Sequence, residues 1–188
     1  LVGSEMCIRD RLSAEPVDIL GLAALRGLFS AVSTEPVTFV NAPQIAEERG
    51  VSIEVDTHTE ALTHRSVVTV RAVTADGDVT SISGALTGLE KVEKIIGING
   101  RNFDMRAEGH NVVLSYQDRP GALGLFATAL GNADVDIISC ALSPDAKGTG
   151  ATALLRLNRA LTEDEMETVS SAVGQLVLPR WISRECHD

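Results

Sequence analysis

The segment best suited to ligand chemistry spans residues 116–123 and reads YQDRPGAL. A strand ends here, Asp118 can cap a helix, and Pro120 and Gly121 suit the helix's first turn. A helix N-terminus offers free N–H groups and partial positive charge, and Gly121 lets a ligand approach the backbone closely. A small carboxylate could dock there while its ammonium group pairs with Asp118. A capped helix that binds nothing explains the same residues.

A second candidate site is basic. Lys94, Arg101 and Arg106 are close in sequence, and Arg156 lies further along the chain. A local basic group in an acidic protein predicts a specific anion site. A two-residue turn at Asn99–Gly100 places Lys94 and Arg101 on one face of a hairpin. Arg106 then points to the other face, so a bulge or a chain–chain interface is needed to gather them. Solvated charges that protect strand edges explain the pattern equally well.

Other motifs that carry chemistry are weak. Residues 148–153 (GTGATA) match the G-x-G-x-x-A dinucleotide pattern, but a loop precedes them and a strand follows, so a hairpin turn is the better interpretation. The four histidines and three cysteines are scattered, so neither a metal site nor a disulfide framework is predicted. Cys140 lies in an apolar run and is expected to be buried. No catalytic residue is assigned.

Composition excludes several classes of protein. The 188 residues include 16 Lys and Arg against 26 Asp and Glu, a net charge of −10, which argues against a nucleic-acid partner. No apolar stretch approaches the 18 residues of a membrane span, so no membrane partner is expected. No signal peptide is visible, and a reduced, cytoplasmic setting follows.

The first half of the chain is predicted to be α+β and strand-rich. Apolar spacing over 18–33 predicts a helix, and a second helix is expected at 42–49 with Asn41 as its cap. Alternating residues and the turns Asp76–Gly77 and Asn99–Gly100 predict the strands, which are 51–55, 66–73, 79–86, 92–98 and 101–106.

The second half has the order β-α-β-β-α-β, the ferredoxin-like arrangement. Its strands are expected at 111–117, 135–142, 151–157 and 178–182. The first helix should bury a stripe of four residues, Leu123, Phe126, Ala127 and Leu130. The second should begin with a capping box of Thr162 and Glu165 and bury Met166, Val169, Val173 and Leu176. The strand at 135–142 is expected to be buried.

The segment DRPGAL (118–123) inside this pattern resembles an ACT domain, a module that senses small molecules. Upstream, the chain resembles the C-terminal part of D-3-phosphoglycerate dehydrogenases of the long bacterial type. The segments that carry this likeness are LRGLFS (25–30), VTFVNAPQIAEERG (37–50), HRSVV (64–68), SGALTG (83–88) and INGRNFDMRAEG (98–109). The resemblance covers about residues 16–184.

The resemblance implies an α+β chain of several parts. Residues 13–33 would be a helix from the end of an upstream substrate-binding domain or linker, 34–108 an intervening (allosteric substrate-binding) domain, and 109–188 a ferredoxin-like ACT domain. Residues 1–12 fit neither a helix nor a strand well, and we interpret them as a leader foreign to the native protein.

The family oxidises 3-phosphoglycerate with NAD in L-serine biosynthesis. The resemblance implies that this chain is a regulatory fragment without a cofactor, whose NAD-dependent catalytic domains lie upstream in cis. It implies a homo-oligomer formed through both domains. L-serine would bind between ACT domains near Tyr116, Asp118, Pro120, Gly121 and Asp136. The intervening domain would bind an anion or the substrate through Lys94, Arg101 and Arg106, with Arg156 nearby.

Two positions depart from the family pattern. Asp136 stands where Asn usually holds the serine, and two like charges at about 4 Å oppose binding by roughly 4 kcal/mol at an effective dielectric of 20. Asn102 stands where His is common, which reduces any pH dependence of the anion site.

Two other functions remain open at this point. The β chain of bacterial L-serine dehydratase pairs a similar domain with ACT, and it would need a partner with an iron–sulfur cluster because the cysteines here suit none. A purely structural dimerisation module, whose ligand site Asp136 has weakened, is the other.

Overall fold

The computed structural model describes residues 3–9, 18–30, 33–58, 67–74, 76–145, 148, 150–173 and 182–184. The chain divides into two compact units, residues 1–100 and residues 101–188. No helix among the described residues is long and apolar enough to cross a membrane. The predicted domain boundaries stay predictions.

The first unit combines two helices with five strands that lie side by side in the order β2-β1-β3-β4-β5. Its elements are β1 (Gly3–Arg9), α1 (Asp18–Ser30), α2 (Ala42–Glu48), β2 (Ser52–His58), β3 (Val67–Val73), β4 (Val79–Thr87) and β5 (Val92–Ile98). β1 is parallel to β2, and the pairs β1–β3, β3–β4 and β4–β5 are antiparallel.

The first strand corrects an expectation from the sequence. Residues 1–12 were predicted to suit no regular element, yet Gly3–Arg9 forms β1 with neighbours on both sides. Met6 faces Val55 on β2 and Val70 on β3, and its side chain is buried. A central strand is stabilised by its neighbours' backbone groups more than by its own residue types, so the pattern did not predict it. That this segment is foreign stays a prediction.

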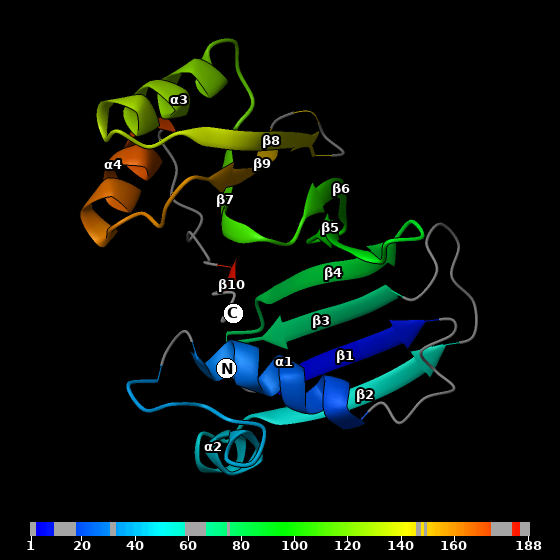
Figure 1. The fold of residues 1–188 in the computed structure, drawn as a ribbon. Helices are drawn as coiled ribbons and strands as arrows, with labels where there is room; N and C mark the ends of the chain where they lie inside the picture. Colours follow the sequence, from blue (N-terminus) through cyan, green and yellow to red (C-terminus); the bar gives the residue numbers. More distant parts are fainter. Residues whose placement is uncertain are drawn as a thin grey trace. The chain divides into compact units, whose positions relative to one another are not determined.

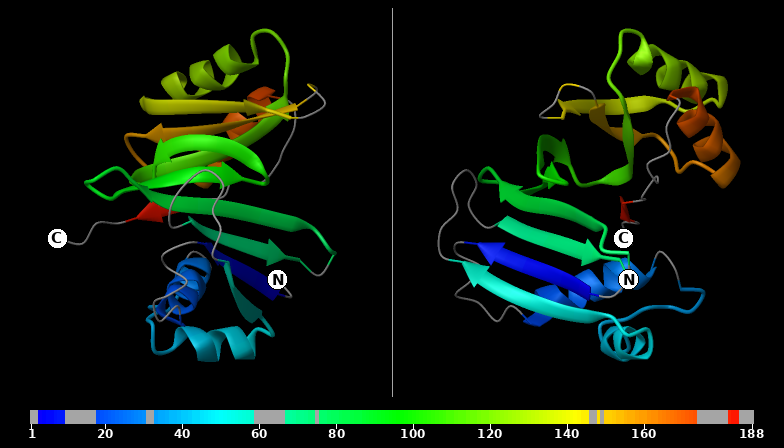
Figure 2. Two further views of the ribbon diagram at one scale, coloured as in Figure 1. Left: turned by 90° about the vertical axis from the view of Figure 1, so that its right-hand side faces the viewer. Right: turned by 180° about the vertical axis from the view of Figure 1, so that it is seen from behind.

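The helices of the first unit share a small core. α1 lies against β2, with α2 beside it (Figure 2). Leu25 and Phe29 of α1 are buried with residues of the following turn and helix, namely Val37, Ala42, Ala46 and Val51. Asn41 holds the predicted N-cap position of α2, but its amide side chain bonds back to Thr38 and Pro36 instead of to the helix. The prediction is therefore right in place and wrong in mechanism.

The second unit is the predicted ferredoxin-like fold, preceded by one extra strand. Its elements are β6 (Arg101–Arg106), β7 (Gly109–Gln117), α3 (Ala122–Asn132), β8 (Ile137–Pro144), β9 (Gly150–Leu157), α4 (Glu163–Val173) and β10 (Ile182–Arg184). The antiparallel sheet has the order β10-β7-β9-β8, and α3 and α4 lie together on one face (Figure 1). This order confirms the β-α-β-β-α-β prediction.

The core of the second unit lies between that face and the two helices. Alternation along β7 buries Val112, Leu114 and Tyr116. From the helices, Phe126, Leu130, Met166 and Val169 fill the layer, as predicted. Of the strand predicted at 178–182, Ile182 begins β10, while residues 178–181 lie outside the described residues. Leu176 and the burial of Val173 also lie outside what the structure describes.

Two predictions about this core are wrong. Leu123 is 44% exposed. The buried face of α3, which begins at Ala122, consists of Ala122, Phe126 and Leu130 instead. The strand predicted at 135–142 to be buried is β8, an edge strand with alternate residues exposed. Cys140 is therefore exposed on this edge rather than buried. Apolar composition alone does not separate an edge strand from a central one.

Candidate functional site

The loop between β7 and α3 presents the predicted ligand segment at the surface. Asp118, Pro120 and Gly121 are all exposed. Gly121 has φ of 90° and occupies the N-cap position, a left-handed conformation that glycine adopts without strain. Asp118 was expected to cap the helix, and this is wrong: no side chain caps α3, since three residues separate Asp118 from Ala122.

The helix N-terminus therefore keeps part of its binding capacity. The N–H of Ala122 bonds to the carbonyl oxygen of Arg119, and the first turn of α3 holds no acidic residue. An anionic group would meet the partial positive charge of the helix here, with no internal carboxylate in competition.

Tyr116 belongs to the core more than to the loop. Its ring packs edge-on against Phe126, with centroids 5.7 Å apart, and the residue is 6% exposed. Burial raises the pKa of its phenol, and the charges of Asp118 and Cys140 raise it further. Tyr116 thus lies close to Asp118, but its side chain packs in the core rather than in the exposed loop. Cys140 is exposed, but partial desolvation by its neighbours still raises the pKa of its thiol, which disfavours a thiolate there.

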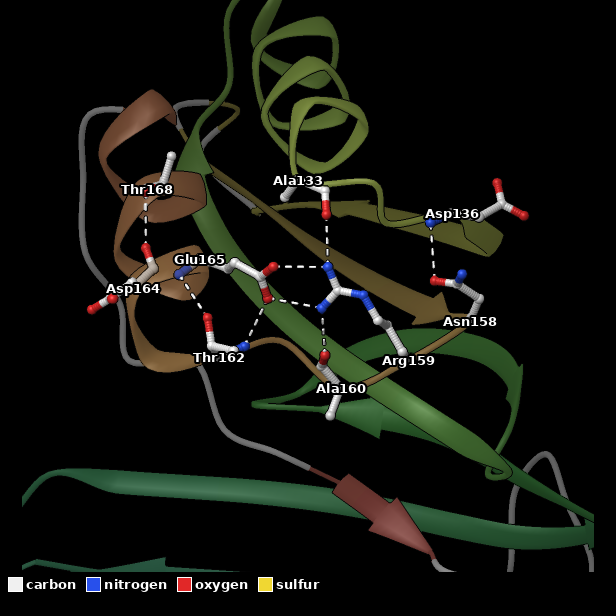
Figure 3. Close-up of polar contacts among 9 residues, drawn as sticks. All are labelled: Ala133, Asp136, Asn158, Arg159, Ala160, Thr162, Asp164, Glu165 and Thr168. Atoms are coloured by element: carbon white, nitrogen blue, oxygen red, sulfur yellow. Dashed lines mark hydrogen bonds and ion pairs between the residues drawn. The ribbon is translucent and has the colours of Figure 1, made fainter.

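Asp136 lies directly before β8, and its backbone is fixed by Asn158 (Figure 3). The N–H of Asp136 donates to Asn158 Oδ1 at 3.0 Å, and the N–H of Asn158 donates to the Asp136 carbonyl at 3.1 Å. Both side chains are exposed. The Asp136 carboxylate in Figure 3 points away from these bonds and is open to a ligand.

Next to Asn158, a cluster around Arg159 joins α3 to α4 (Figure 3). Arg159 Nη1 and Nη2 donate to the two carboxylate oxygens of Glu165 at 2.9 and 2.7 Å, and Nη2 also donates to the Ala133 carbonyl at 2.6 Å. The predicted capping box is present: Thr162 N–H donates to Glu165 at 2.9 Å and Glu165 N–H to Thr162 Oγ1 at 3.3 Å. These bonds lower the pKa of Glu165 to about 2, with the Arg159 hydrogen bond first.

The two parts of the predicted serine site lie at opposite ends of one sheet. Gln117, at the end of β7, faces Gly150 on β9, and the neighbouring pair on the other side of β9 is Pro144 with Ala151. The start of β8 is paired at the other end, with Leu157. At about 3.3 Å per residue, the ends of β8 lie roughly 23 Å apart. Within one chain, Asp118 and Asp136 therefore do not meet.

The predicted basic site has two separate parts in the second unit. Arg101 Nη1 contacts the hydroxyl of Thr152, which lies 3.3 Å from Ser115 Oγ. Thr152 points away from the helices, because its neighbours Ala151 and Ala153 belong to the core. Lys94, on β5 of the first unit, is half-buried.

The other part joins Arg106 and Arg156 through Glu108. Arg156 Nη1 contacts Glu108 Oε1, and Arg106 Nη1 lies 3.8 Å from Glu108 Oε2. The Arg156 side chain is 20% exposed, while those of Arg106 and Glu108 are 54% and 52% exposed. Alternation along β6 places Arg106 on the face opposite Phe103 and Met105, which are buried.

Sequence reasoning did not find Glu108 or Asn111. Asn111 faces Arg156 across β7 and β9 and is 1% exposed. Its Nδ2 donates to the Glu108 carbonyl at 3.1 Å, while its Oδ1 and Arg156 Nε are buried with no hydrogen-bond partner in the described part of the chain. Position 108 entered the sequence analysis only as the expected end of the intervening domain at 34–108, and the sign that could have revealed Glu108 is its position two residues after Arg106.

The glycine motif at 148–153 runs into β9 at Gly150, and β9 pairs antiparallel with β8, as expected for a hairpin. Gly148 has φ of 70°, and the Asp145 N–H donates to the Gly150 carbonyl at 2.7 Å. No helix follows it, so it does not fit a dinucleotide. Among the described residues, no group of three or more His, Cys, Asp or Glu could hold a metal ion.

The chain is similar to known proteins along most of its length. Residues 7–99 match the D-3-phosphoglycerate dehydrogenase intervening domain. The chain is 53% identical over 167 residues to D-3-phosphoglycerate dehydrogenase of Mycobacterium leprae, covering 89% of this chain and 32% of that protein. It is 28% identical over 156 residues to the Bacillus subtilis protein of the same name, covering 82% and 29%. The chain spans about a third of the length of these relatives.

Proposed function

Because residues 7–99 match the D-3-phosphoglycerate dehydrogenase intervening domain and most of the chain is similar to such dehydrogenases, we propose that this chain is the regulatory part of one. In this role the chain itself contributes no catalytic residue. NAD and the oxidation belong to catalytic domains of a cytoplasmic parent protein. The second unit binds L-serine as an effector, and its arginines bind a small anion or the substrate.

The serine proposal rests on one observation: within a single chain, Asp118 and Asp136 lie at opposite ends of the sheet. β8 is an edge strand, and its sequence IISCALSP holds no charged residue to block pairing. If β8 paired antiparallel with β8 of a second copy, the start of one strand would lie beside the end of the other. Asp136 of one copy would then approach Asp118 of the other. The exposed side chains of Ile138 and Leu142 would be covered at this interface between the two β8 strands.

The charged and polar groups at such a β8–β8 interface are complementary to an amino acid. The serine carboxylate would accept hydrogen bonds at the N-terminus of α3, and its ammonium group would pair with Asp118. Asp136 would stand close to the carboxylate and weaken binding through like-charge repulsion. The proposal is therefore a homo-oligomer that binds L-serine between copies, with affinity limited by Asp136.

Calorimetry with L-serine on the 188-residue chain, together with sedimentation, tests this proposal. Asp136→Asn removes the repulsion and adds a donor, so its serine affinity should rise at least tenfold. Asp134→Asn is the matched control, since it removes the same charge from an exposed position two residues away and should change affinity less than twofold. Absence of heat from every variant at millimolar serine, with a monomer throughout, would contradict the proposal.

A further inference from the structure

We propose that Glu108 is a built-in competitor for the anion site, so that a small anion binds Arg106 and Arg156 only by displacing its carboxylate. This inference rests on the proposed anion-binding function and names a residue that sets its affinity. Glu108 forms an ion pair with each of these two arginines.

The position of Glu108 is that of a bound anion. One carboxylate oxygen contacts Arg156 Nη1, and the other faces Arg106 Nη1 at 3.8 Å. A free carboxylate or phosphate would bind a pair of guanidinium groups in the same way. The carboxylate and an incoming anion therefore compete for the same donors, and they also repel each other.

The Glu108 carboxylate can move away from the arginines, whereas the Glu108 backbone and Arg156 are held in place. Half of the Glu108 side chain is exposed, so its carboxylate can turn into water at little cost. Its main chain stays in place because Asn111 Nδ2 holds the carbonyl oxygen at 3.1 Å. Arg156 is mostly buried on β9, in register with Asn111, and remains where it is.

Arg156 is also incompletely satisfied by Glu108. Its Nε is buried and has no hydrogen-bond partner among the described residues, and neither has the facing Asn111 Oδ1. A single carboxylate contact at Nη1 thus leaves a buried donor unused, which costs free energy. An anion with several oxygens, such as a phosphate group, offers more acceptors than Glu108 supplies. The chemistry points to a phosphate or a polycarboxylate as the displacing ligand.

The test is calorimetric titration of the 188-residue chain with inorganic phosphate at constant ionic strength. Glu108→Gln removes the competing charge in nearly the same volume, and phosphate should bind it about tenfold more tightly than the natural chain. Glu167→Gln, on the exposed side of α4, makes the same change in net charge and should alter phosphate affinity less than twofold. Arg156→Gln should bind phosphate at least tenfold more weakly than the natural chain.

The outcomes separate this inference from the function beneath it. If phosphate binding needs Arg156 but Glu108→Gln leaves it unchanged, the competitor role is wrong and the anion site stands. If Glu108→Gln and Glu167→Gln strengthen binding equally, net charge is the cause and the inference is also wrong. If Arg156→Gln binds phosphate like the natural chain, the anion site fails, and the inference with it.

Discussion

The second unit contains two arginine–glutamate pairs that differ in how fully their atoms are used. Arg159 meets both oxygens of Glu165 with two nitrogens and also donates to the Ala133 carbonyl, while Glu165 accepts the Thr162 N–H. Arg156 meets Glu108 through one nitrogen, and its Nε has no hydrogen-bond partner in the described part of the chain.

This difference separates a structural pair from a pair suited to binding. The Arg159 pair joins three segments of chain, and its bonds lower the pKa of Glu165 to about 2 and raise that of Arg159. A ligand would have to replace several bonds at once to enter there. The Arg156 pair leaves a buried donor unused beside a half-exposed carboxylate. A ligand can improve on what Glu108 provides, so binding function is expected at this pair.

The largest expected effect comes from breaking the two pairs in turn. Arg156→Gln should reduce phosphate affinity at least tenfold and change Tm less than Arg159→Gln does. Arg159→Gln should lower Tm by several degrees and leave phosphate affinity within twofold, because it separates α3 from the start of α4. Calorimetric titration and thermal unfolding of both variants check this. Equal loss of Tm and of phosphate affinity in both would end the distinction between the pairs.

Acid unfolding sharpens the same comparison from the structural side. The Glu165 pKa falls from 4.5 to about 2 in the folded chain, so its contribution to stability is present above pH 4.5. That contribution is lost as pH falls toward 2, because protonation removes the acceptor of Arg159 and Thr162. Glu165→Gln should therefore be less stable at pH 7 and lose less stability between about pH 4.5 and 2. Urea midpoints across this range measure the slopes, and identical slopes would contradict the assignment.

The two pairs also show which features of this molecule could be predicted from its sequence. The capping box of Thr162 and Glu165 spans three residues, and such local geometry follows directly from helix spacing. The order of strands and helices in the second unit was predictable for the same reason, since each element has its own period. The DRPGAL segment likewise placed Gly121 at the start of α3, although Asp118 lies too far before the helix to cap it.

Contacts between distant segments were not predictable in this way. Arg159 reaches Ala133, and Glu108 reaches Arg156, only because the sheet order β10-β7-β9-β8 brings their segments together. The edge position of β8 and the central position of β1 are properties of topology, which residue types do not encode. For the same reason, the sequence identified Asp136 as a candidate site residue but did not reveal that it lies at the end of the sheet opposite Asp118.

The smallest expected effect concerns Asn158, which links the structural pair to the proposed serine site. Its Oδ1 accepts the Asp136 N–H at 3.0 Å, and its neighbour Arg159 holds Ala133. Asn158→Ala should cost about 0.5–1 kcal/mol in unfolding free energy, because one exposed hydrogen bond is lost and the backbone bond from Asn158 to Asp136 remains. Asn158→Asp keeps the acceptor and is the matched variant. If Asp136 is placed for serine by this bond, Asn158→Ala should weaken serine binding severalfold more than Asn158→Asp, whereas equal affinities would limit Asn158 to folding.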